Sequence, residues 1–299
     1  MALLGRTIFL TGGSRGIGHA IAVRCARDGA NVIVAAKTAD PHPKLAGTIF
    51  SAAEDIEKAG GKALPLQLDC RSTDDIDAAI AKAVQHFGGI DILINNASAL
   101  SPTPTEKTSP QKYDLMASIN TRGTYFTTKA AIPHLKKAKN PHVLNLSPPL
   151  NMDPRWFALG GVAYTMSKYG MSMCVLGHAE EFREDGIAFN ALWPAFAVAT
   201  AAVENALGDA AMLASRKVDI MSDAAYWILT QDSRKCTGNF FIDEEVLKAN
   251  GATQADIDAY SVKRGMPLIP DLYVGEPSHL ARWMKAQEMM KKASNFFKS

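Results

Sequence analysis

A tyrosine and a lysine four positions apart are the residues in this sequence best suited to chemistry. Tyr164 and Lys168 fall within residues 161–184, a stretch that we expect to be helical, and residues spaced by four share one face of a helix. A free phenol has a pKa near ~10, and an adjacent ammonium group lowers it. We therefore predict that Tyr164 donates or accepts a proton near neutral pH, with Lys168 as its electrostatic partner.

A glycine-rich turn near the N-terminus could bind phosphate. The segment Thr11-Gly12-Gly13-Ser14-Arg15-Gly16-Ile17-Gly18 follows a short apolar run and precedes a helical stretch. Gly12 allows a sharp turn, and Gly16 and Gly18 let a pyrophosphate approach the backbone because they carry no Cβ atom. The helix N-terminus supplies free N–H groups and a partial positive charge. We expect the dinucleotide to be bound by Gly12, Ser14, Arg15, Gly16, Ile17 and Gly18.

The end of the second expected strand bears on the choice of dinucleotide. Proteins that bind NAD in this way usually carry an acidic residue there, which accepts from the ribose 2′-hydroxyl. This chain has Ala36 followed by Lys37. Lys37 and Arg15 together suit a 2′-phosphate, so we predict NADP(H) as the cofactor. The alternative interpretation is that both are solvated surface charges.

Apolar runs alternate with helical stretches along most of the chain, which predicts a parallel sheet covered on both faces. We expect strands at residues 7–10, 32–35, 90–94, 143–146, 187–193 and 240–242, and a further strand ending at Asp69. The expected helices span residues 16–27, 48–58, 72–87, 110–137 and 161–184. The predicted fold is α/β, a doubly wound parallel sheet of about seven strands (a Rossmann fold), in one domain over residues 1–245. Residues 246–299 form an extension, packed on this domain or on a neighbouring subunit, that ends in a helix over about 278–293.

Several motifs together resemble the short-chain dehydrogenase/reductase family. They are the T-G-x-x-x-G-x-G turn, Asn95-Asn96-Ala97-Ser98 for N-N-A-G, Asn120 to Gly123 for N-x-x-G, and Tyr164 to Lys168 for Y-x-x-x-K. The resemblance covers about residues 5–243. It implies that Lys168 holds the nicotinamide ribose and that Asn120 holds a water behind Lys168 as a proton relay. It also implies cofactor contacts from Asp69, which would hold the adenine amino group, and from Asn95, Ala97, Pro194 and Thr200. The alternative role for Asp69 is to cap the next helix.

The serine expected in such a site is displaced in this chain. The family usually places it about 13 residues before the tyrosine, as the second of a Ser-Ser pair. Here Ser147 lies 17 residues before Tyr164, and Pro148 takes the second position. Ser147 either donates to the reacting oxygen or only terminates its strand. Thr200 also lies one residue later than usual, and Pro194 is followed by Ala195 rather than by glycine.

The segment at residues 196–217 resembles the family's substrate lid and is rich in Ala, Val, Leu and Met. An apolar pocket could be lined by Trp156, Phe157, Trp193, Phe196, Met212 and Leu213. Such a pocket favours a lipophilic alcohol or carbonyl compound, although each of these residues could equally be ordinary core. The expected helices 110–137 and 161–184 carry more apolar residues than one core-facing stripe needs. We therefore expect a homodimer or homotetramer.

Composition narrows the remaining possibilities. The 32 basic and 30 acidic residues give a net charge of +2, without the electrostatic signature of a nucleic-acid-binding protein. The four cysteines lie far apart, so we expect no metal site. We find no targeting signal and no stretch that could span a membrane, and we expect a cytoplasmic protein, with an organellar matrix as the alternative. The function that fits best is an NADP(H)-dependent oxidoreductase. The rivals are a nucleotide-binding sensor or scaffold with little turnover, and one module of a lipid-handling assembly.

Overall fold

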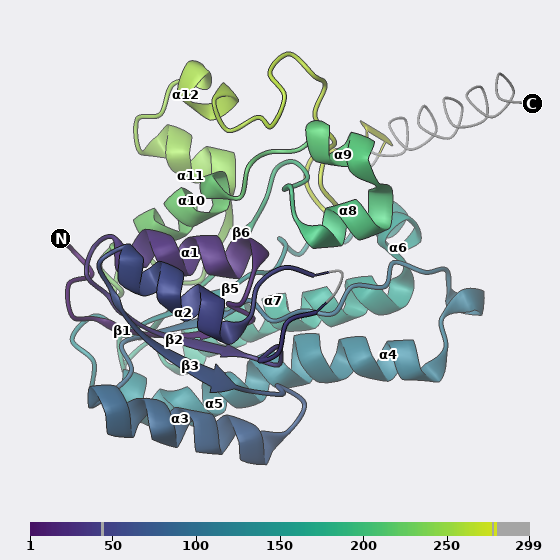
Figure 1. Ribbon diagram of the computed structural model, residues 1–299. Helices are drawn as coiled ribbons and strands as arrows, with labels where there is room; N and C mark the ends of the chain where they lie inside the picture. Colours follow the sequence, from purple (N-terminus) through teal and green to yellow (C-terminus); the bar gives the residue numbers. More distant parts are fainter. Residues whose placement is uncertain (43–44, 277, 280–299) are drawn as a thin grey trace, which may run out of the picture.

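The computed structural model describes residues 1–42, 45–276 and 278–279. Its centre is one parallel sheet of seven strands in the order β3-β2-β1-β4-β5-β6-β7 (Figure 1). The strands are β1 (Thr7–Thr11), β2 (Asn31–Ala36), β3 (Lys62–Gln67), β4 (Ile92–Asn95), β5 (His142–Asn145), β6 (Ala188–Trp193) and β7 (Phe240–Ile242). This confirms the predicted doubly wound α/β fold. The strand expected to end at Asp69 ends two residues earlier, at Gln67.

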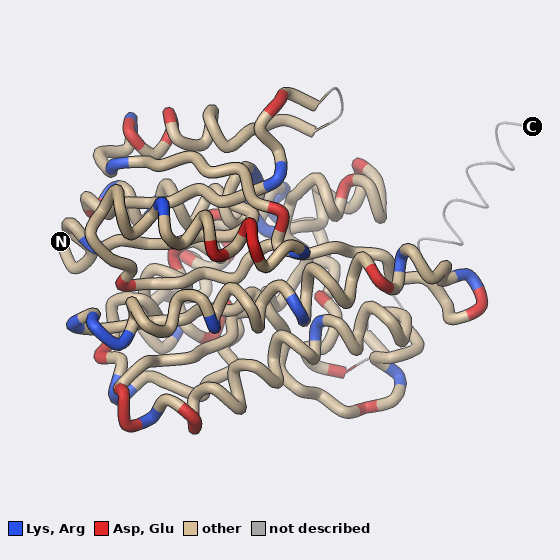
Figure 2. The backbone as a smooth tube through the Cα atoms, turned by 90° about the horizontal axis from the view of Figure 1, so that it is seen from below, with Lys and Arg blue, Asp and Glu red and all other residues tan. Residues whose placement is uncertain are grey.

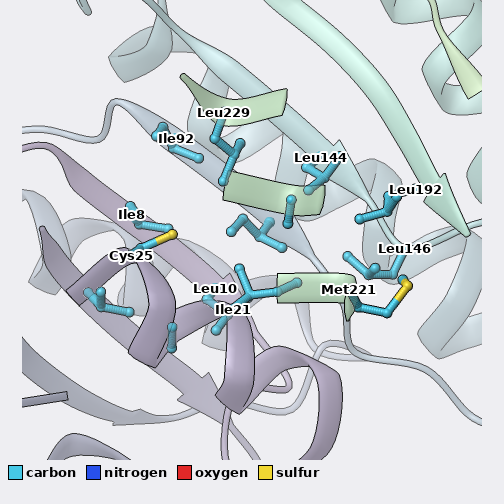
Figure 3. Close-up of a cluster of buried hydrophobic side chains, with 14 of the residues drawn as sticks. Ile8, Leu10, Ile21, Cys25, Ile92, Leu144, Leu146, Leu192, Met221 and Leu229 are labelled. Carbon is cyan, nitrogen blue, oxygen red and sulfur yellow. The ribbon is translucent and has the colours of Figure 1, made fainter. Parts of the chain in front are cut away.

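Helices cover both faces of the sheet and bury two separate apolar clusters. One face carries α1 (Gly16–Ala26), α2 (Ile49–Lys58), α10 (Asp219–Leu229) and α11 (Asp243–Ala249). Figure 3 shows this cluster, where Ile8 and Leu10 of β1 meet Ile21 of α1 and Met221 of α10. The other face carries α3 (Thr73–Phe87), α5 (Thr124–Leu135) and α7 (Val162–Glu181). Because both faces are covered, the strands are almost entirely apolar, as the sequence indicated.

Helix α3 illustrates how local sequence sets these boundaries. The Ser72 side chain accepts a hydrogen bond from the Asp75 amide and so caps the first turn. Gly88 follows the last turn with a φ of 86°, a left-handed conformation that glycine adopts at little cost. Between these ends, Ile76 and Ile80 are buried on one face. The predicted bounds of this helix are therefore confirmed.

Two expected segments differ from the structure. The helix expected over residues 110–137 is built from α4 (Pro110–Met116), a π-helical segment (Ala117–Gly123) and α5. The stretch between Ser147 and residue 161, where no helix was expected, contains the helix α6 (Pro154–Gly160), which begins at a proline and is capped by the Asp153 side chain. A proline in the first turn and an aspartate cap are start signals that the sequence analysis did not use.

A third apolar cluster lies beyond the carboxyl ends of the strands. It joins α6 and α7 to the lid helices α8 (Ala201–Leu207) and α9 (Asp209–Leu213), and to residues 266–274. Figure 1 shows α6, α8 and α9 gathered at one end of the molecule. The short helix α12 (Gln254–Asp258) lies between α11 and the segment at residues 266–274. Of the helix expected over about 278–293, nearly all lies outside the described residues.

The surface is mixed in charge, and the helices are of ordinary length for a globular protein. Figure 2 shows Lys and Arg interspersed with Asp and Glu. Within the described ranges, no helix is both long enough and apolar enough to cross a bilayer.

Candidate active site

The register of the sheet brings the chemical motifs to one edge. Thr11 at the end of β1 lies beside Asn95 of β4, and Asn95 lies beside Asn145 of β5. Loops that leave these parallel strands at their carboxyl ends therefore meet in one place. Binding sites of open α/β sheets form at this edge.

Close packing inside the protein requires glycine at two positions of the glycine-rich turn. Gly12 has a φ of 71°, and a Cβ there would lie 2.9 Å from the Ala97 Cα. A Cβ on Gly18 would lie 2.7 Å from the Gly12 carbonyl oxygen. Helix α1 has no acidic residue in its first turn, and its N-cap residue, Arg15, makes no side-chain cap within the described chain. The first N–H groups of this helix thus face a space that suits an anion.

Asn96 holds this turn in place, a role that the sequence analysis did not assign. Its side-chain amide donates to the carbonyl oxygens of Gly12 (2.8 Å) and Thr11 (3.1 Å). In return, the Thr11 hydroxyl accepts from the main-chain amides of Asn96 and Ala97, at 3.1 Å each. Ala97 therefore lies against the glycine-rich turn. The N-N-A-S motif was the available signal for Asn96.

Asn95 differs from its neighbour because its side chain is used inside the protein. It is buried, and its amide donates to Asn145 Oδ1 (2.9 Å) and Thr128 Oγ1 (3.1 Å). The Asn145 amide in turn donates to the Met171 carbonyl oxygen (3.1 Å). The Asn95 side-chain amide nitrogen thus ties β4 to β5 and α5, whereas its Oδ1 has no hydrogen-bond partner among the described residues.

Cationic side chains gather beyond β2. Arg15 donates to the carbonyl oxygens of Ala46 (2.9 Å) and Gly47 (2.7 Å). Lys37 is exposed, and its Nζ lies 3.6 Å from Asp69 Oδ2. Asp69 is bound chiefly by Arg71, whose guanidinium donates to both carboxylate oxygens at 2.5–3.0 Å and lowers the pKa of Asp69 to about 2. Arg71, which the sequence analysis missed, adds a third cation here.

Tyr164 and Lys168 lie on the same face of α7, as predicted, and both are buried. The Lys168 Nζ donates to the Leu146 carbonyl oxygen at 2.6 Å and lies 5.0 Å from the centre of the Trp193 ring. Burial lowers the pKa of Lys168 to about 7, and the carboxyl group of Asp271 partly opposes this effect. Lys168 can therefore exchange a proton near neutral pH.

The proton affinity of Tyr164 differs from the sequence-based expectation. Burial raises the pKa of its hydroxyl well above 10, and Tyr273 and Asp271 raise it further. The sequence argument considered only the ammonium group of Lys168, which here is engaged by Leu146 and Trp193. In this structure, the loss of hydration outweighs that influence.

Asn120 is completely buried within the π-helical segment. Its side chain accepts from the Ala99 amide (2.7 Å) and donates to the Ala99 carbonyl oxygen (2.9 Å) and to Ser167 Oγ (2.9 Å). The side chain thus clamps the loop after β4 to α7. The proton-relay role predicted for Asn120 would have to be performed by its main chain.

Ser147 is buried, and its hydroxyl has no hydrogen-bond partner within the described part of the chain. The loop after it is held by α7: Ser172 Oγ donates to the Pro148 carbonyl oxygen (2.6 Å), and the Tyr169 hydroxyl donates to that of Asn151. A buried hydroxyl without a partner costs free energy. The Ser147 hydroxyl therefore has an unused hydrogen-bond capacity, although the residue is 0% exposed.

The lid begins against the cofactor side of the site. The Thr200 side chain lies 3.6 Å from the position that a Cβ on Gly16 would occupy. Ala195, which follows Pro194, donates its amide to Asp243 Oδ1 at 2.9 Å. The lid thus joins the phosphate-binding turn to the end of β7.

Only some of the residues expected to line an apolar pocket lie together with Tyr164. Trp156 and Trp193 lie in the same apolar cluster as Tyr164, with Phe157 packed against it. Phe196 lies beneath the Arg216 guanidinium, 5.7 Å from it. Leu213 is 44% exposed, whereas its neighbours Ala211 and Ala214 are buried. The inward face of α9 is therefore made by these small residues rather than by Leu213, and the partly buried Met212 lies outside the cluster.

The C-terminal segment supplies groups that the sequence analysis did not assign to the site. Tyr273 is 1% exposed, and its hydroxyl lies 3.0 Å from Thr165 Oγ1, next to Tyr164. Its ring packs against those of Trp156, Tyr169 and Trp193. This segment carries no recognisable motif, so only the folded chain reveals its position.

The glycine-rich turn, the Tyr164–Lys168 pair and the seven-stranded parallel sheet together define a nicotinamide-dependent oxidoreductase fold. The chain belongs to the short chain dehydrogenase family, which matches residues 6–210. It is 57% identical over 285 residues to hydroxysteroid dehydrogenase-like protein 2 of Danio rerio, covering 95% of this chain and 68% of that protein. The protein of the same name from Rattus norvegicus is 57% identical over 274 residues, which cover 92% of this chain and 51% of that protein.

A solved structure supports the same assignment. A short chain dehydrogenase of Mycobacterium thermoresistibile is 51% identical, with a TM-score of 0.86, covering 92% of this chain and 97% of that one. The chain thus matches the family in fold as well as in sequence.

Proposed function

We propose that this protein is an NADP(H)-dependent oxidoreductase that interconverts an alcohol and a carbonyl group on a lipophilic molecule. The observation that carries the proposal is the buried Tyr164–Lys168 pair. Tyr164 belongs to an aromatic cluster, and the carboxyl-terminal edge of the same sheet also carries an uncapped, glycine-rich helix N-terminus. This arrangement combines an acid–base group, a dinucleotide site and an apolar wall.

The chain's own residues would act through the movement of one proton. In the reducing direction, the Tyr164 hydroxyl donates a proton to the carbonyl oxygen, and the Ser147 hydroxyl donates a hydrogen bond to the same oxygen. A nicotinamide cofactor, when bound, would supply the hydride that converts the carbonyl compound to the alcohol. Lys168 would hold its ribose and would return a proton to Tyr164, and a Lys168 pKa of about 7 suits this exchange. Oxidation reverses these steps.

The preference for NADP(H) rests on the cations beyond β2. Lys37 and Arg71 flank the Asp69 carboxylate, and Arg15 lies nearby on the phosphate-binding turn. No acidic residue ends β2, where Ala36 is buried. A 2′-phosphate would gain charge-assisted hydrogen bonds from this group of cations.

The Lys37→Ala variant tests this preference. We expect its dissociation constant for NADPH to rise about tenfold, and that for NADH to change little, because only NADPH carries the extra phosphate. Binding is measured by nucleotide fluorescence titration. Lys58→Ala, which removes an exposed lysine on α2, is the matched control. Equal effects on the two nucleotides would contradict the preference.

The lipophilic substrate class rests on the apolar cluster that contains Tyr164. Trp156, Trp193, Ile269 and Tyr273 belong to one buried cluster with Tyr164. A pocket with apolar walls and few polar groups binds through the removal of apolar surface from water. The test is NADPH oxidation by a panel of carbonyl compounds that contains aliphatic and aromatic ketones, aldehydes and sugars. Preferred turnover of sugars would contradict the proposal.

A nucleotide-binding sensor with little turnover is the second candidate. It is favoured by the buried Ser147, by Pro148 after it, and by burial of Tyr164, which raises the pKa of that hydroxyl. The same panel discriminates between the two. Tight NADPH binding without oxidation by any compound would favour the sensor.

We also propose a homodimer or homotetramer. Large apolar side chains that point away from the core are exposed on α4, α5 and α7: Tyr113, Leu115, Tyr125, Met166, Met173 and Leu176, each between 40% and 57% exposed. Exposed apolar surface of this kind marks an interaction site. Light scattering at micromolar concentration should give at least twice the mass of the chain. A monomeric mass would contradict this.

A further inference from the structure

Helix α7 begins without a side-chain cap, close to the residue that we propose as proton donor. Tyr164 is the third residue of this helix, and Gly161, which precedes the helix with a φ of 78°, has no side chain to cap the first turn. The first turn of a helix lacks part of its own hydrogen bonds and opens more easily than the centre. The position of Tyr164 therefore depends on contacts that other elements make with this turn.

Tyr273 of the C-terminal segment makes such a contact. Its hydroxyl lies 3.0 Å from Thr165 Oγ1, which is a hydrogen bond between two buried side chains. Thr165 directly follows Tyr164, and its main-chain amide donates to the Gly161 carbonyl oxygen at 3.0 Å, the first hydrogen bond of the helix. The Tyr273 hydroxyl thus ties the first turn of α7 to a segment more than a hundred positions away.

The surroundings of Tyr273 keep its hydroxyl at Thr165. A Cβ on Gly160, the last residue of α6, would lie 2.6 Å from the Tyr273 hydroxyl and 3.0 Å from Thr165 Oγ1. The Tyr273 ring packs against three aromatic rings, with centroids 6.0 Å from Trp156, 5.3 Å from Tyr169 and 6.1 Å from Trp193. The side chain is therefore held between α6, α7 and the end of β6.

Main-chain hydrogen bonds fix the segment that carries Tyr273. Ile269 accepts from the Ala197 amide at 2.9 Å and donates its own amide to the Ala214 carbonyl oxygen at 3.0 Å. The ring N–H of Trp193 donates to the Leu272 carbonyl oxygen at 2.9 Å. The segment is thus bound to both ends of the lid and to the last residue of β6, so it can serve as a support for α7.

The backbone of Tyr273 is strained. Its φ is 70°, and it is the only non-glycine residue with a positive φ among those described. A bulky side chain in this conformation costs free energy, and it persists where the surroundings hold it. Such strain is concentrated at functional sites. The strain indicates that the placement of this side chain matters more than a relaxed backbone.

We propose that Tyr273 is a positioning residue of the active site: its hydrogen bond to Thr165 holds the first turn of α7, and with it the Tyr164 hydroxyl, in the place from which a proton is transferred. The inference rests on the proposed function, because it takes Tyr164 as the proton donor. It assigns a role to a residue beyond the range 6–210, which the family match covers.

The first test does not depend on turnover. Hydrogen exchange of main-chain amides is followed by NMR in the parent and in Tyr273→Phe, which loses the hydroxyl and keeps the ring. The Thr165 amide should exchange about two- to tenfold faster in the variant, the range that one hydrogen bond supplies. The increase should be larger there than at Val175, further along the same helix. Tyr226→Phe, which removes a hydroxyl bonded to Asp28, is the matched control and should leave Thr165 unchanged.

The second test combines turnover with a double-variant cycle. Thr165→Val keeps the shape of the side chain but loses its hydroxyl. Tyr273→Phe and Thr165→Val should each lower kcat for NADPH-linked reduction by about two- to tenfold and leave the NADPH dissociation constant unchanged. The double variant should be no slower than either single variant, because both changes remove the same hydrogen bond. Tyr226→Phe should keep the parental kcat.

The outcomes separate this role from a general effect on stability. An unchanged exchange rate at Thr165, an equal increase at Thr165 and Val175, or additive losses of kcat in the double variant would overturn the proposal. Faster exchange confined to the first turn, in a protein without turnover, would support the role of Tyr273 but overturn the proposed enzymatic function. If Tyr273→Phe does not fold, Thr165→Val carries the exchange test, measured at the amide of Met166 in the adjoining position.

Discussion

Around the glycine-rich turn, contacts join neighbouring strands of the sheet, such as those of Gly12 with Asn96. Around Tyr164, they join α7 to a segment more than a hundred positions away, such as the contact of Thr165 with Tyr273. The cofactor side is thus built from loops that directly follow strands. The substrate side is assembled from α6, the lid and the C-terminal segment, none of which belongs to the sheet. The cofactor side therefore depends on the sheet, whereas the substrate side depends on packing between segments that are far apart in the sequence.

The largest effect should come from Tyr164, where the two sides meet. In Tyr164→Phe the ring stays but the proton donor is lost, so turnover should fall by about 10²–10⁴-fold. NADPH should bind as it does in the parent, measured by fluorescence titration. Near-parental turnover would show that another group moves the proton.

Ser147 should rank second. Removal of one hydrogen-bond donor to a developing oxyanion typically costs about 10²–10³-fold in turnover, and Ser147→Ala should cost at least about tenfold. The fold should survive, because the hydroxyl has no partner to lose within the described residues. If Ser147→Ala turned over at the rate of the parent protein while Tyr164→Phe was inactive, Ser147 would only terminate its strand.

Two matched glycine variants test whether the cofactor side and the substrate side act independently. In Gly18→Ala the new methyl group would lie 2.7 Å from the Gly12 carbonyl oxygen, and in Gly160→Ala it would lie 2.6 Å from the Tyr273 hydroxyl. Such overpacking costs about 1–3 kcal/mol locally, which would weaken binding by about 5-fold to about 100-fold if it fell on the binding step. We expect Gly18→Ala to raise the NADPH dissociation constant, and Gly160→Ala to raise KM for the carbonyl substrate. If both variants raised the same constant, the two sides would not be independent.

The smallest effect concerns stability and pH. Burial raises the pKa of Asp243 to about 7, above the value of about 3.8 for an exposed aspartate. The folded state therefore holds a proton that the unfolded state releases, and the contribution of Asp243 to stability is lost as pH rises through 7. Asp243→Asn removes this loss. The free energy of unfolding is measured by urea denaturation for the variant and for the parent at each pH. The difference, variant minus parent, should increase by about 2 kcal/mol between pH 5 and pH 8. Asp77→Asn, exposed on α3, should show no such trend.

The sequence predicted the cofactor side better than the substrate side, for a physical reason. Alternation of buried strands and capped helices is a local pattern, and it located the sheet, α3 and the turn that contains Gly12 and Gly18. The direction of a side chain depends on its tertiary neighbours. For this reason, the sequence did not predict that the Asn95 and Asn120 side chains form hydrogen bonds within the protein. It also did not predict that Arg71 joins the other cations near Asp69. Asp271 and Tyr273 lie in a segment without motif or periodicity, so no local signal connected them with Tyr164.

The lid is anchored at both ends, which limits how the site could open. At one end Thr200 lies against Gly16. At the other, the buried Arg216 donates to Glu244 Oε1 at 2.6 Å and to the Ile257 carbonyl oxygen at 3.0 Å. To break a buried ion pair of this kind is costly, because each charge would be left without its partner. Between the anchors, α8 and α9 form the stretch whose displacement would admit a ligand while the ion pair stays intact. Exchange of substrate and product would then depend on a short hinged flap, and its rate could be altered without touching either Tyr164 or the cofactor turn.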